Sequence, residues 1–564
     1  SSDVCSSDLE QCIRKPLLSP EDAPNIKGSA ETEKDPQRKV VDALACYYKA
    51  ILNPSQRKVI ELAQRSLSAD QNAKGNGFIL VQGPPGTGKS RTIVALIAVL
   101  LAKLKEPKFK GQKILVCAPS NAAVDVLGKR LLSGIKSGTL DDDGVALKDF
   151  VPSIIRLGPG CTDNDVLEVS LDAKLRRDTS ITELELLNKS DIWLSTCMAI
   201  GARRYRRCKP KFLAVIVDEA SQAIELDCLI PLLPSIVGSA ESPETEGHAK
   251  PADSVEPAES KHPEGRGAKL CILVGDTKQL PPFDELSAAE TVIEKGLMGR
   301  LVEHFQHCCN NCVRLKVQYR MHPTIASFPA KTFYSGFVEN DASVYDPTVF
   351  DKPYHLDSRG RFGPLTWIDT SLLANNKEGV NESTRSAYNS CELEIVKNLV
   401  VSLARLHPSC IRKNVVVVSA YSEQLGMLKK IQEDVPEMVQ SLSSQSTVDS
   451  MQGDEQDIVI LTTVRSNLSK KIGFLVDYRR MNVGITRARY SLIIIGNAST
   501  LKVDPVWKEF ASHCRDAKNP NVHFIRPPST SNIVSTDTFC KELFPESKSS
   551  YGVSWEMIND HKKR

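Results

Sequence analysis

The sequence lacks a long hydrophobic run. Its most extended apolar stretch, Thr92 to Leu104, is shorter than the roughly 20 residues that a membrane-spanning helix needs. Residues 1–12 are polar and contain no apolar core, so we expect no secretory signal in them. The formal charge is also small, at +3 from 72 basic and 69 acidic residues, and by itself it favours no polyanionic partner. We therefore expect no membrane partner, and a surface for nucleic acid must come from local clusters.

The 16 cysteines lack the regular spacing of a disulfide framework. This pattern is typical of a reducing compartment, the nucleus or the cytosol. One cluster, His307, Cys308, Cys309 and Cys312, suggests a zinc site. A structural zinc site usually takes its four ligands from two separated pairs, and no second pair follows at a suitable spacing. We favour ordinary thiols and keep the metal site as the alternative.

Short apolar runs alternate with helical patterns along most of the chain. Such runs are typical of parallel strands that are buried on both faces under helices. With 564 residues, the chain also exceeds what one hydrophobic core normally serves. We predict an α/β fold of two tandem, doubly wound parallel-sheet domains. The predicted strands are 78–81, 114–118, 214–217 and 271–274 in the first domain, and 415–418, 458–461 and 492–495 in the second.

Changes in composition suggest the domain boundaries. Residues 1–36 are rich in Ser, Pro, Asp and Glu, which indicates a flexible lead-in. Two inserts interrupt the first domain: 136–190 has mixed helical signals, and 238–268 has almost no large apolar side chain and is expected to be disordered. The predicted divisions are a first domain at 37–311, a second domain at 312–525 and a tail at 526–564.

Residues 83–90 match the phosphate-binding pattern G-x-x-x-x-G-K-S. They lie between a predicted strand and an apolar helical segment, the context that separates a true phosphate loop from a chance match. The glycines let backbone N–H groups point at phosphate oxygens, Lys89 can neutralise the β- and γ-phosphates, and Ser90 can ligate Mg²⁺. We predict an ATP and Mg²⁺ site rather than an ordinary Gly/Pro turn. Its loop consists of Gly83, Pro84, Pro85, Gly86, Thr87, Gly88, Lys89 and Ser90.

Polar motifs also follow two other strands, at the edge where ligands bind in such sheets. Asp218 and Glu219 follow the strand at 214–217. Asp218 is placed to hold Mg²⁺ through water and Glu219 to polarise an attacking water, although an acidic pair at a strand end can also be a solvated turn. Gln279 follows the strand at 271–274. Its amide can donate to a γ-phosphate and change partner when that group leaves, or it can simply cap a turn.

Two arginines of the second half, Arg320 and Arg487, are candidates for contacting the same nucleotide. Phosphoryl transfer spreads negative charge over the γ-oxygens, and guanidinium groups stabilise that charge well. If both arginines reach the phosphate from the second domain, ATP closes the cleft and hydrolysis opens it. The alternative is that they form salt bridges on the domain surface.

The densest basic run lies at 203–211 and contains Tyr205. Nucleic-acid phosphates would favour such a run, and the tyrosine ring could stack on a base. A charge run is more often a solvated face, so both interpretations stay open.

Eight motifs occur in one order along the chain, and together they resemble those of a superfamily-1 helicase. They lie at 53–56, 83–90, 118–125, 218–222, 275–282, 318–323, 447–455 and 483–489. The stretch 473–483 makes the chain similar to the branch that holds senataxin and the nonsense-mediated-decay helicase, with senataxin as the nearer likeness. The resemblance extends over about residues 40–515.

The resemblance implies two RecA-like domains and roles for further residues. Gln56 reads the adenine edge, Tyr319 stacks near the base and Glu455 contacts the ribose. Ser120, Asn121, Thr196 and Thr447 lie on the nucleic-acid path. The implied activity is ATP-dependent 5′-to-3′ translocation on single-stranded RNA or DNA, with unwinding of RNA–DNA hybrids or RNA duplexes. The resemblance also implies a monomer in the nucleus, with the cytoplasm as alternative, and it identifies no protein partner.

The chain departs from the family pattern at several positions. Thr277, Phe283 and Ala420 stand where proline, threonine and proline are usual, and the β-barrel insert that the branch carries before Gln56 has no room here. Alternatives to an unwinding RNA enzyme therefore stay open. They are a DNA helicase of the same superfamily, a nucleic-acid-stimulated ATPase that clamps RNA–protein complexes without unwinding, and a metabolic P-loop kinase, against which Arg320 and Arg487 argue.

Overall fold

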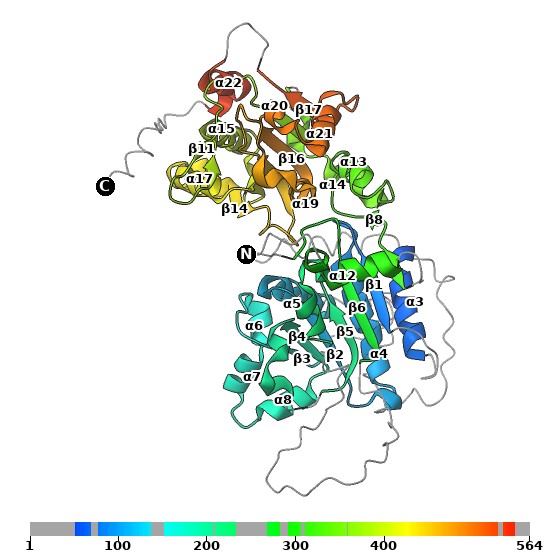
Figure 1. Cartoon of the computed structure of the whole chain (residues 1–564). Helices are drawn as coiled ribbons and strands as arrows, with labels where there is room; N and C mark the ends of the chain where they lie inside the picture. Colours follow the sequence, from blue (N-terminus) through cyan, green and yellow to red (C-terminus); the bar gives the residue numbers. More distant parts are fainter. Residues whose placement is uncertain are drawn as a thin grey trace, which may run out of the picture.

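The computed structural model contains two parallel β-sheets, one in each domain, each covered by helices on both faces (Figure 1). It describes residues 51–68, 77–136, 152–206, 208, 210–232, 268–282, 292–305, 311–357, 359–527 and 534–547. The predicted lead-in at 1–36, the cysteine cluster at 307–309 and all but the last residue of the predicted disordered insert at 238–268 lie outside these residues.

The first sheet has seven strands in the order β3-β4-β2-β5-β6-β1-β7, all parallel. Alternate residues of each strand point to opposite faces, so one strand supplies two cores. Ile79 of β1 packs under α3, α4 and α5, whereas Leu80 packs under α7, α8, α10 and α12. The strands are β1 Phe78–Gln82, β2 Lys113–Ala118, β3 Ile154–Arg156, β4 Ile192–Thr196, β5 Phe212–Val217, β6 Leu270–Gly275 and β7 Cys312–Arg314. The helices are α3 Pro54–Ser68, α4 Lys89–Leu104, α5 Asn121–Lys136, α6 Asn164–Glu168, α7 Leu171–Arg177, α8 Glu183–Lys189, α9 Arg203–Arg206, α10 Glu225–Leu229 and α12 Val292–Phe305.

The second sheet has six parallel strands in the order β14-β13-β15-β16-β10-β17. Val417 of β13 faces the core under α15, α17, α18 and α22, and Val416 faces the core under α13, α19 and α21. The strands are β10 Leu365–Asp369, β13 Val415–Ser419, β14 Leu442–Thr447, β15 Gln456–Thr462, β16 Ala488–Gly496 and β17 Val522–Ile525, with the short pairs β8 Val317–Gln318 with β9 Glu339–Asn340, and β11 Gly379–Val380 with β12 Ala387–Tyr388. The helices are α13 Pro323–Thr332, α14 Pro347–Phe350, α15 Ser390–Leu406, α16 Pro408–Ile411, α17 Ser422–Asp434, α18 Pro436–Ser441, α19 Tyr478–Ile485, α20 Ala498–Leu501, α21 Pro505–Arg515 and α22 Thr536–Leu543.

The predicted α/β class and all seven predicted strands are confirmed, whereas three boundaries are wrong. The predicted second domain starts at Cys312, but β7 pairs with β1 in the first sheet. The predicted insert at 136–190 contributes β3, which pairs with β4. The predicted tail contains α22, whose Phe539 and Cys540 are buried in the second domain's core. In each case a distant partner decides where the segment belongs, and no local pattern announces that partner.

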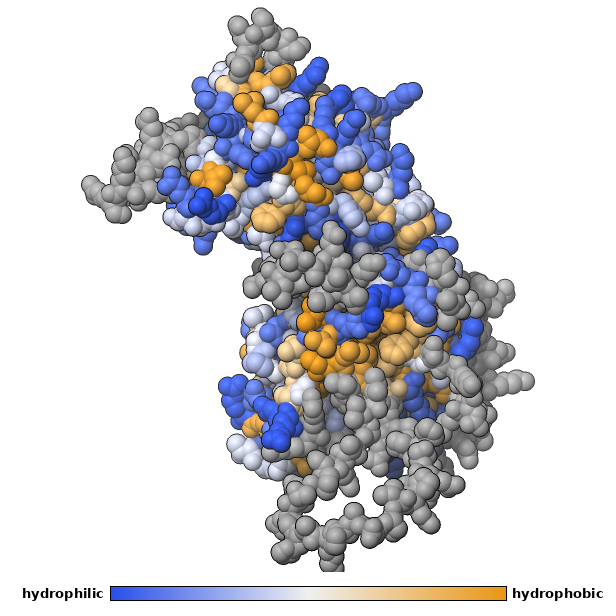
Figure 2. All heavy atoms as spheres, in the orientation of Figure 1, coloured by the Kyte–Doolittle hydropathy of each residue, from blue (hydrophilic) through white to orange (hydrophobic). Residues whose placement is uncertain are grey.

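The outer surface of the molecule agrees with helices that bury one face against a sheet and expose the other. On the visible face of the second domain most side chains are hydrophilic, as amphipathic helices that cover a sheet require (Figure 2). Apolar side chains gather on the visible face of the first domain near α12 (Figure 2). Within the described residues, no helix combines the length and the apolar character needed to cross a bilayer.

Candidate nucleotide site between the two domains

The predicted phosphate loop connects β1 to α4 with two glycines in a left-handed conformation. Gly86 has φ 72° and Gly88 has φ 80°, values that other residues adopt only under strain. A Cβ on Gly88 would lie 2.6 Å from Nε2 of Gln56, and one on Gly86 would lie 2.7 Å from Cβ of Arg320. Both positions therefore require glycine because neighbouring chain segments approach the loop closely.

Hydrogen bonds hold the loop in this shape. Lys89 Nζ donates to the Gly83 carbonyl at 2.9 Å, and Thr87 Oγ1 donates to the Pro84 carbonyl at 2.7 Å. Gln56, the predicted adenine reader, is almost fully buried and donates through Nε2 to the Thr87 carbonyl at 3.1 Å. Its Oε1 accepts from the Asn53 N–H, so Gln56 also braces the loop from α3.

The predicted metal and water-activating carboxylates lie at the end of β5. Asp218 is buried, and burial together with the negative charge of Glu219 raises the pKa of its carboxyl to about 7, against the opposing effect of Lys89. Glu219 has φ 49°, an unusual backbone conformation for a residue with a side chain. Its carboxylate accepts from Gln222 Nε2 at 2.9 Å.

The donor set fits ATP with Mg²⁺. Hydroxyl and carboxylate oxygens are ligands that Mg²⁺ prefers, and Ser90 and Asp218 provide one of each. The glycine-lined loop at the start of α4 offers the backbone N–H groups and helix terminus that bind phosphates. Within the described residues, no group of three or more His, Cys, Asp or Glu side chains is arranged to hold a metal ion.

Sequence reasoning missed one arginine at this site. Arg130 of α5 donates through Nη1 to Ser90 Oγ at 2.7 Å. Its charge offsets a small part of the rise in the pKa of Asp218 and, after Arg320, helps to lower the pKa of Glu455. Arg130 lies 40 residues after Ser90 in the chain and belongs to no recognisable sequence motif. The periodicity of α5 could not have singled it out.

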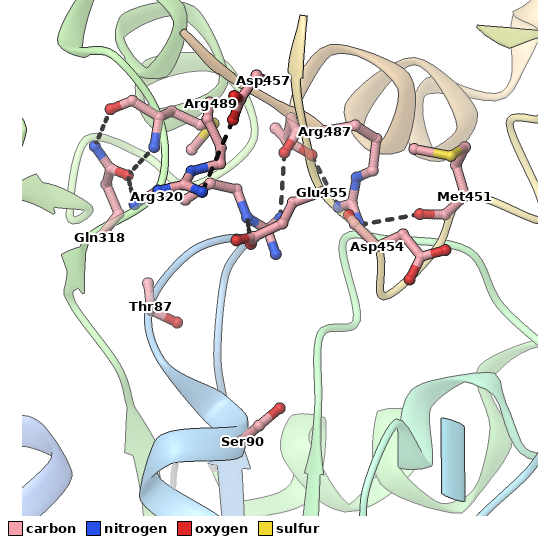
Figure 3. A network of polar contacts seen from close by, with 12 residues as sticks. Thr87, Ser90, Gln318, Arg320, Met451, Asp454, Glu455, Asp457, Arg487 and Arg489 are labelled. Carbon is pink, nitrogen blue, oxygen red and sulfur yellow. Dashed lines mark hydrogen bonds and ion pairs between the residues drawn. The ribbon is translucent and has the colours of Figure 1, made fainter. Parts of the chain in front are cut away.

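The second domain approaches the phosphate loop with Arg320 (Figure 3) and with the preceding residue, Tyr319. The Tyr319 N–H donates to the Gly86 carbonyl at 2.8 Å, and its hydroxyl accepts from Asn53 Nδ2 at 2.9 Å. Arg320 Nε contacts Glu455 Oε2 at 2.6 Å, and this guanidinium lowers the pKa of Glu455 to about 2. Arg320 therefore forms a salt bridge, as the alternative interpretation predicted. This salt bridge lies beside the phosphate loop.

Arg487 is buried at the same interface. Its guanidinium donates to the Met451 and Asp454 carbonyls (Figure 3). It also donates to the Val483 carbonyl, and burial lowers its pKa to about 10. Across the interface, Nη2 donates to Gln279 Oε1 at 3.1 Å. The two predicted residues Arg487 and Gln279, 208 positions apart, therefore meet directly.

The four predicted nucleic-acid residues all follow or end strands of the two sheets, but they differ in accessibility. Ser120 is exposed, whereas Asn121 accepts from Arg156 Nη2 at 2.6 Å. Thr196 is buried and its hydroxyl accepts from the Ala199 N–H. Thr447 donates to Ser450 Oγ at 2.9 Å.

The structure excludes base stacking by Tyr205. Only 3% of this residue is exposed, and its hydroxyl accepts from the Gly158 N–H at 3.0 Å. The neighbouring Arg204 is exposed but ion-paired with Glu183 at 2.9 Å. The ring of Tyr205 packs in the first domain's core, because α9 turns it inward. The basic residues around it in the sequence did not indicate this burial.

Two family models, both described as an AAA domain, match the chain. One covers 51–184 and 170–237, and the other covers 293–499. The chain is 30% identical to the ATP-dependent helicase upf1 of Schizosaccharomyces pombe over 78% of its length and 44% of that protein. It is also 30% identical to the helicase sen1 of the same yeast, over 77% of this chain and 29% of that protein. The solved structure of Saccharomyces cerevisiae Dbp5 bound to RNA and ADP BeF3 matches 88% of this chain and 98% of that one with a TM-score of 0.39 and 11% identity, too low a similarity to argue from.

The phosphate loop on one parallel sheet, facing arginines from a second, is the arrangement of a P-loop nucleotide hydrolase with two α/β domains. More particularly, the chain belongs to the superfamily-1 helicases, in their Upf1- and Sen1-like branch. It spans less than half the length of these two relatives. Because both identities are 30%, the comparisons do not favour the senataxin side of the branch over the other.

Proposed function

We propose that this chain is an ATP-driven motor that translocates 5′ to 3′ on single-stranded RNA or DNA and unwinds RNA–DNA hybrids or RNA duplexes. The contact of Arg487 with Gln279 carries the proposal. It places a second-domain guanidinium against the first-domain residue predicted to sense the γ-phosphate. A reducing compartment, the nucleus or the cytoplasm, suits its many unpaired thiols.

The proposed chemistry follows from where the side chains lie. Bound ATP with Mg²⁺ supplies the phosphoryl group whose transfer to water releases the energy. Lys89 neutralises phosphate charge, and Ser90 and Asp218 provide the oxygens for the metal. Glu219 accepts the proton of the attacking water.

Arg320 and Arg487 complete the site from the second domain. They stabilise the charge that spreads over the phosphoryl oxygens during transfer. Because they belong to one domain and Lys89 to the other, the nucleotide attracts both domains toward itself. When that charge leaves, the attraction weakens and the cleft opens.

Strand displacement measured beside ATP hydrolysis tests the proposal, with matched RNA and DNA oligomers as substrates. We expect turnover that polynucleotide stimulates, displacement that requires ATP, and loss of both activities in Lys89→Ala. Glu219→Gln is expected to bind ATP without turning it over. Polynucleotide-stimulated turnover without displacement supports the clamp, and turnover indifferent to polynucleotide contradicts both.

A further inference from the structure

A closed ring of buried hydrogen bonds connects the predicted phosphate sensor to the second domain. Gln279 accepts from Arg487 through Oε1 and donates through Nε2 to Asp276 Oδ2 at 2.7 Å. The same Asp276 oxygen accepts from the hydroxyl of Tyr334 at 2.6 Å. Asp276 therefore holds one first-domain side chain and one second-domain side chain on a single carboxylate oxygen.

The ring continues through α19 and returns to Arg487. Asn482 Nδ2 donates to the Tyr334 hydroxyl at 2.7 Å and to the Lys278 carbonyl at 2.8 Å. Thr486 Oγ1 donates to the Asn482 carbonyl at 2.6 Å and accepts from Arg487 Nη2 at 3.1 Å. The contacts cross the domain interface at separate points, and every side chain in the ring is at least nine-tenths buried.

The ring also connects to the water-activating end of the site. The Asp276 N–H donates to Ser221 Oγ at 3.0 Å, and Ser221 lies two residues after Glu219. Within the described residues the Tyr334 hydroxyl bonds Asp276 and Asn482 and no residue of the phosphate loop, so we expect it to act through those two residues.

We infer that Tyr334 and Asn482 are positioning residues that transmit the state of Gln279 to the second domain. Gln279 can turn toward a γ-phosphate only by giving up Arg487 or Asp276. Tyr334, just after α13, holds Asp276, and Asn482 of α19 holds the Lys278 carbonyl. A change of partner at Gln279 therefore pulls on the second domain and does more than reorient a side chain. The inference rests on the sensor role proposed for Gln279.

Tyr334→Phe is a mild test of this inference. The ring of the side chain stays, Asp276 Oδ2 keeps Gln279 as a donor, and Asn482 Nδ2 keeps the Lys278 carbonyl as an acceptor. We therefore expect the variant to fold. Tyr345→Phe is the matched control, because it removes a hydroxyl from an exposed tyrosine of the same domain, one that accepts from Asn340 Nδ2 at 3.0 Å.

The first measurement is the dissociation constant of a labelled single-stranded oligomer, with ADP and with a non-hydrolysable ATP analogue. The ratio of the two constants reports the coupling between the sites, and such factors are typically about 5–150. We expect the parent and Tyr345→Phe to share one ratio and Tyr334→Phe to approach about 1. A parent-like ratio in Tyr334→Phe overturns the inference.

The second measurement needs no nucleic acid. Amide hydrogen exchange with the ATP analogue is expected to show protection of both the phosphate loop and α19 in the parent. In Tyr334→Phe the loop is expected to stay protected while α19 loses its protection. Equal protection of α19 in both proteins contradicts the inference, even if the parent binds no polynucleotide and the proposed function itself fails.

A double-mutant comparison separates the ring from two unrelated structural effects. Asn482→Ala alone is expected to lower the coupling ratio as Tyr334→Phe does. Because both act in one chain of contacts, the double variant is expected to lose no more than either single variant. If the double variant instead loses clearly more of the coupling ratio than either single variant, the two residues act independently and the inference is wrong.

Discussion

At the scale of single residues, Arg487 illustrates how this site keeps a charge available inside a protein. Its guanidinium is buried, and within the described residues it donates to carbonyl, amide and hydroxyl oxygens and to no carboxylate. Neutral oxygens solvate the cation without cancelling its charge. Arg320, by contrast, is paired with Glu455. Arg487 therefore keeps more of its positive charge available to the transferred phosphoryl group than Arg320 does.

Gly88→Ala tests the close approach at the phosphate loop. We expect loss of nucleotide binding, because the new Cβ would lie 2.6 Å from Gln56 Nε2. Gly111→Ala is the matched control, since Gly111 has φ 78° with no atom within 4 Å of the added Cβ. Both changes should cost about 1–2 kcal/mol in backbone strain. Fluorescent-nucleotide titration should show normal binding in Gly111→Ala only, and equal binding in both variants would contradict the contact.

Glu392 gives the second domain a dependence on pH. Burial raises the pKa of its carboxyl from 4.5 to about 8, although the Val464 N–H bonds the carboxylate at 2.9 Å. The folded state therefore binds a proton that the unfolded state has released between pH 4.5 and about 8. Stability falls with rising pH in that window, by about 1.4 kcal/mol per pH unit at most.

Glu392→Gln should flatten this dependence. We expect the variant to gain stability over the parent as pH rises from 5 to 8, because its side chain has no proton to lose. The check is thermal unfolding across that range. Glu394→Gln removes a carboxylate from the less buried side of the same helix and should leave the slope as it is in the parent. Parallel curves for parent and Glu392→Gln would refute the assignment.

At the scale of secondary-structure elements, the buried strands explain why so many could be predicted. A strand such as β13, with four valines in succession, supplies both faces of a sheet and is recognisable alone. The edge strand β14 reads Leu-Ser-Ser-Gln-Ser-Thr and is buried only at its first residue, so its sequence carries no such signal. It forms because β13 offers a hydrogen-bonding edge.

Phe544→Ala tests whether the segment after 534 belongs to the second domain. Phe544 is fully buried in the core shared with α15, so we expect the change to cost about 3–5 kcal/mol. Phe474→Ala, at a phenylalanine of the same domain that is 60% exposed, should cost far less. Calorimetry can compare both with the parent. An unchanged unfolding transition in Phe544→Ala would mean that the segment after 534 is not part of the second domain's core.

At the scale of the whole molecule, the two sheets matter because the polar ends of their strands face one shared site, the site that we propose for the nucleotide. Neither domain supplies a complete set of groups: the first brings Lys89, Asp218 and Glu219, and the second brings Arg320 and Arg487. Direct contacts, such as the Tyr319 N–H with the Gly86 carbonyl, already bring the domains together. A divided site of this kind lets one chemical step change the relation of two domains.

Arg487→Ala tests the divided site. Turnover of ATP is expected to fall by about 10²-fold or more, because an arginine that stabilises transferred phosphoryl charge is typically worth 10³–10⁵. Affinity for ATP should decline only modestly. Arg405→Ala, which removes an arginine of α15 that is paired with Glu437 of α18, should leave both constants unchanged. Parent-like turnover in Arg487→Ala would mean that the second domain does not take part in the chemistry.

The sequence by itself determined the local features of this protein. They are the phosphate loop at 83–90, the apolar strands and the order of the motifs, because each depends on residues that are neighbours in the chain. The tertiary structure alone decided the contacts between distant segments. It placed β7 in the first sheet and α22 on the second, turned Tyr205 into the core, and brought Arg130 to Ser90 and Arg487 to Gln279. Strand pairing and side-chain burial depend on partners dozens to hundreds of residues away, and no local pattern encodes which partner will be there.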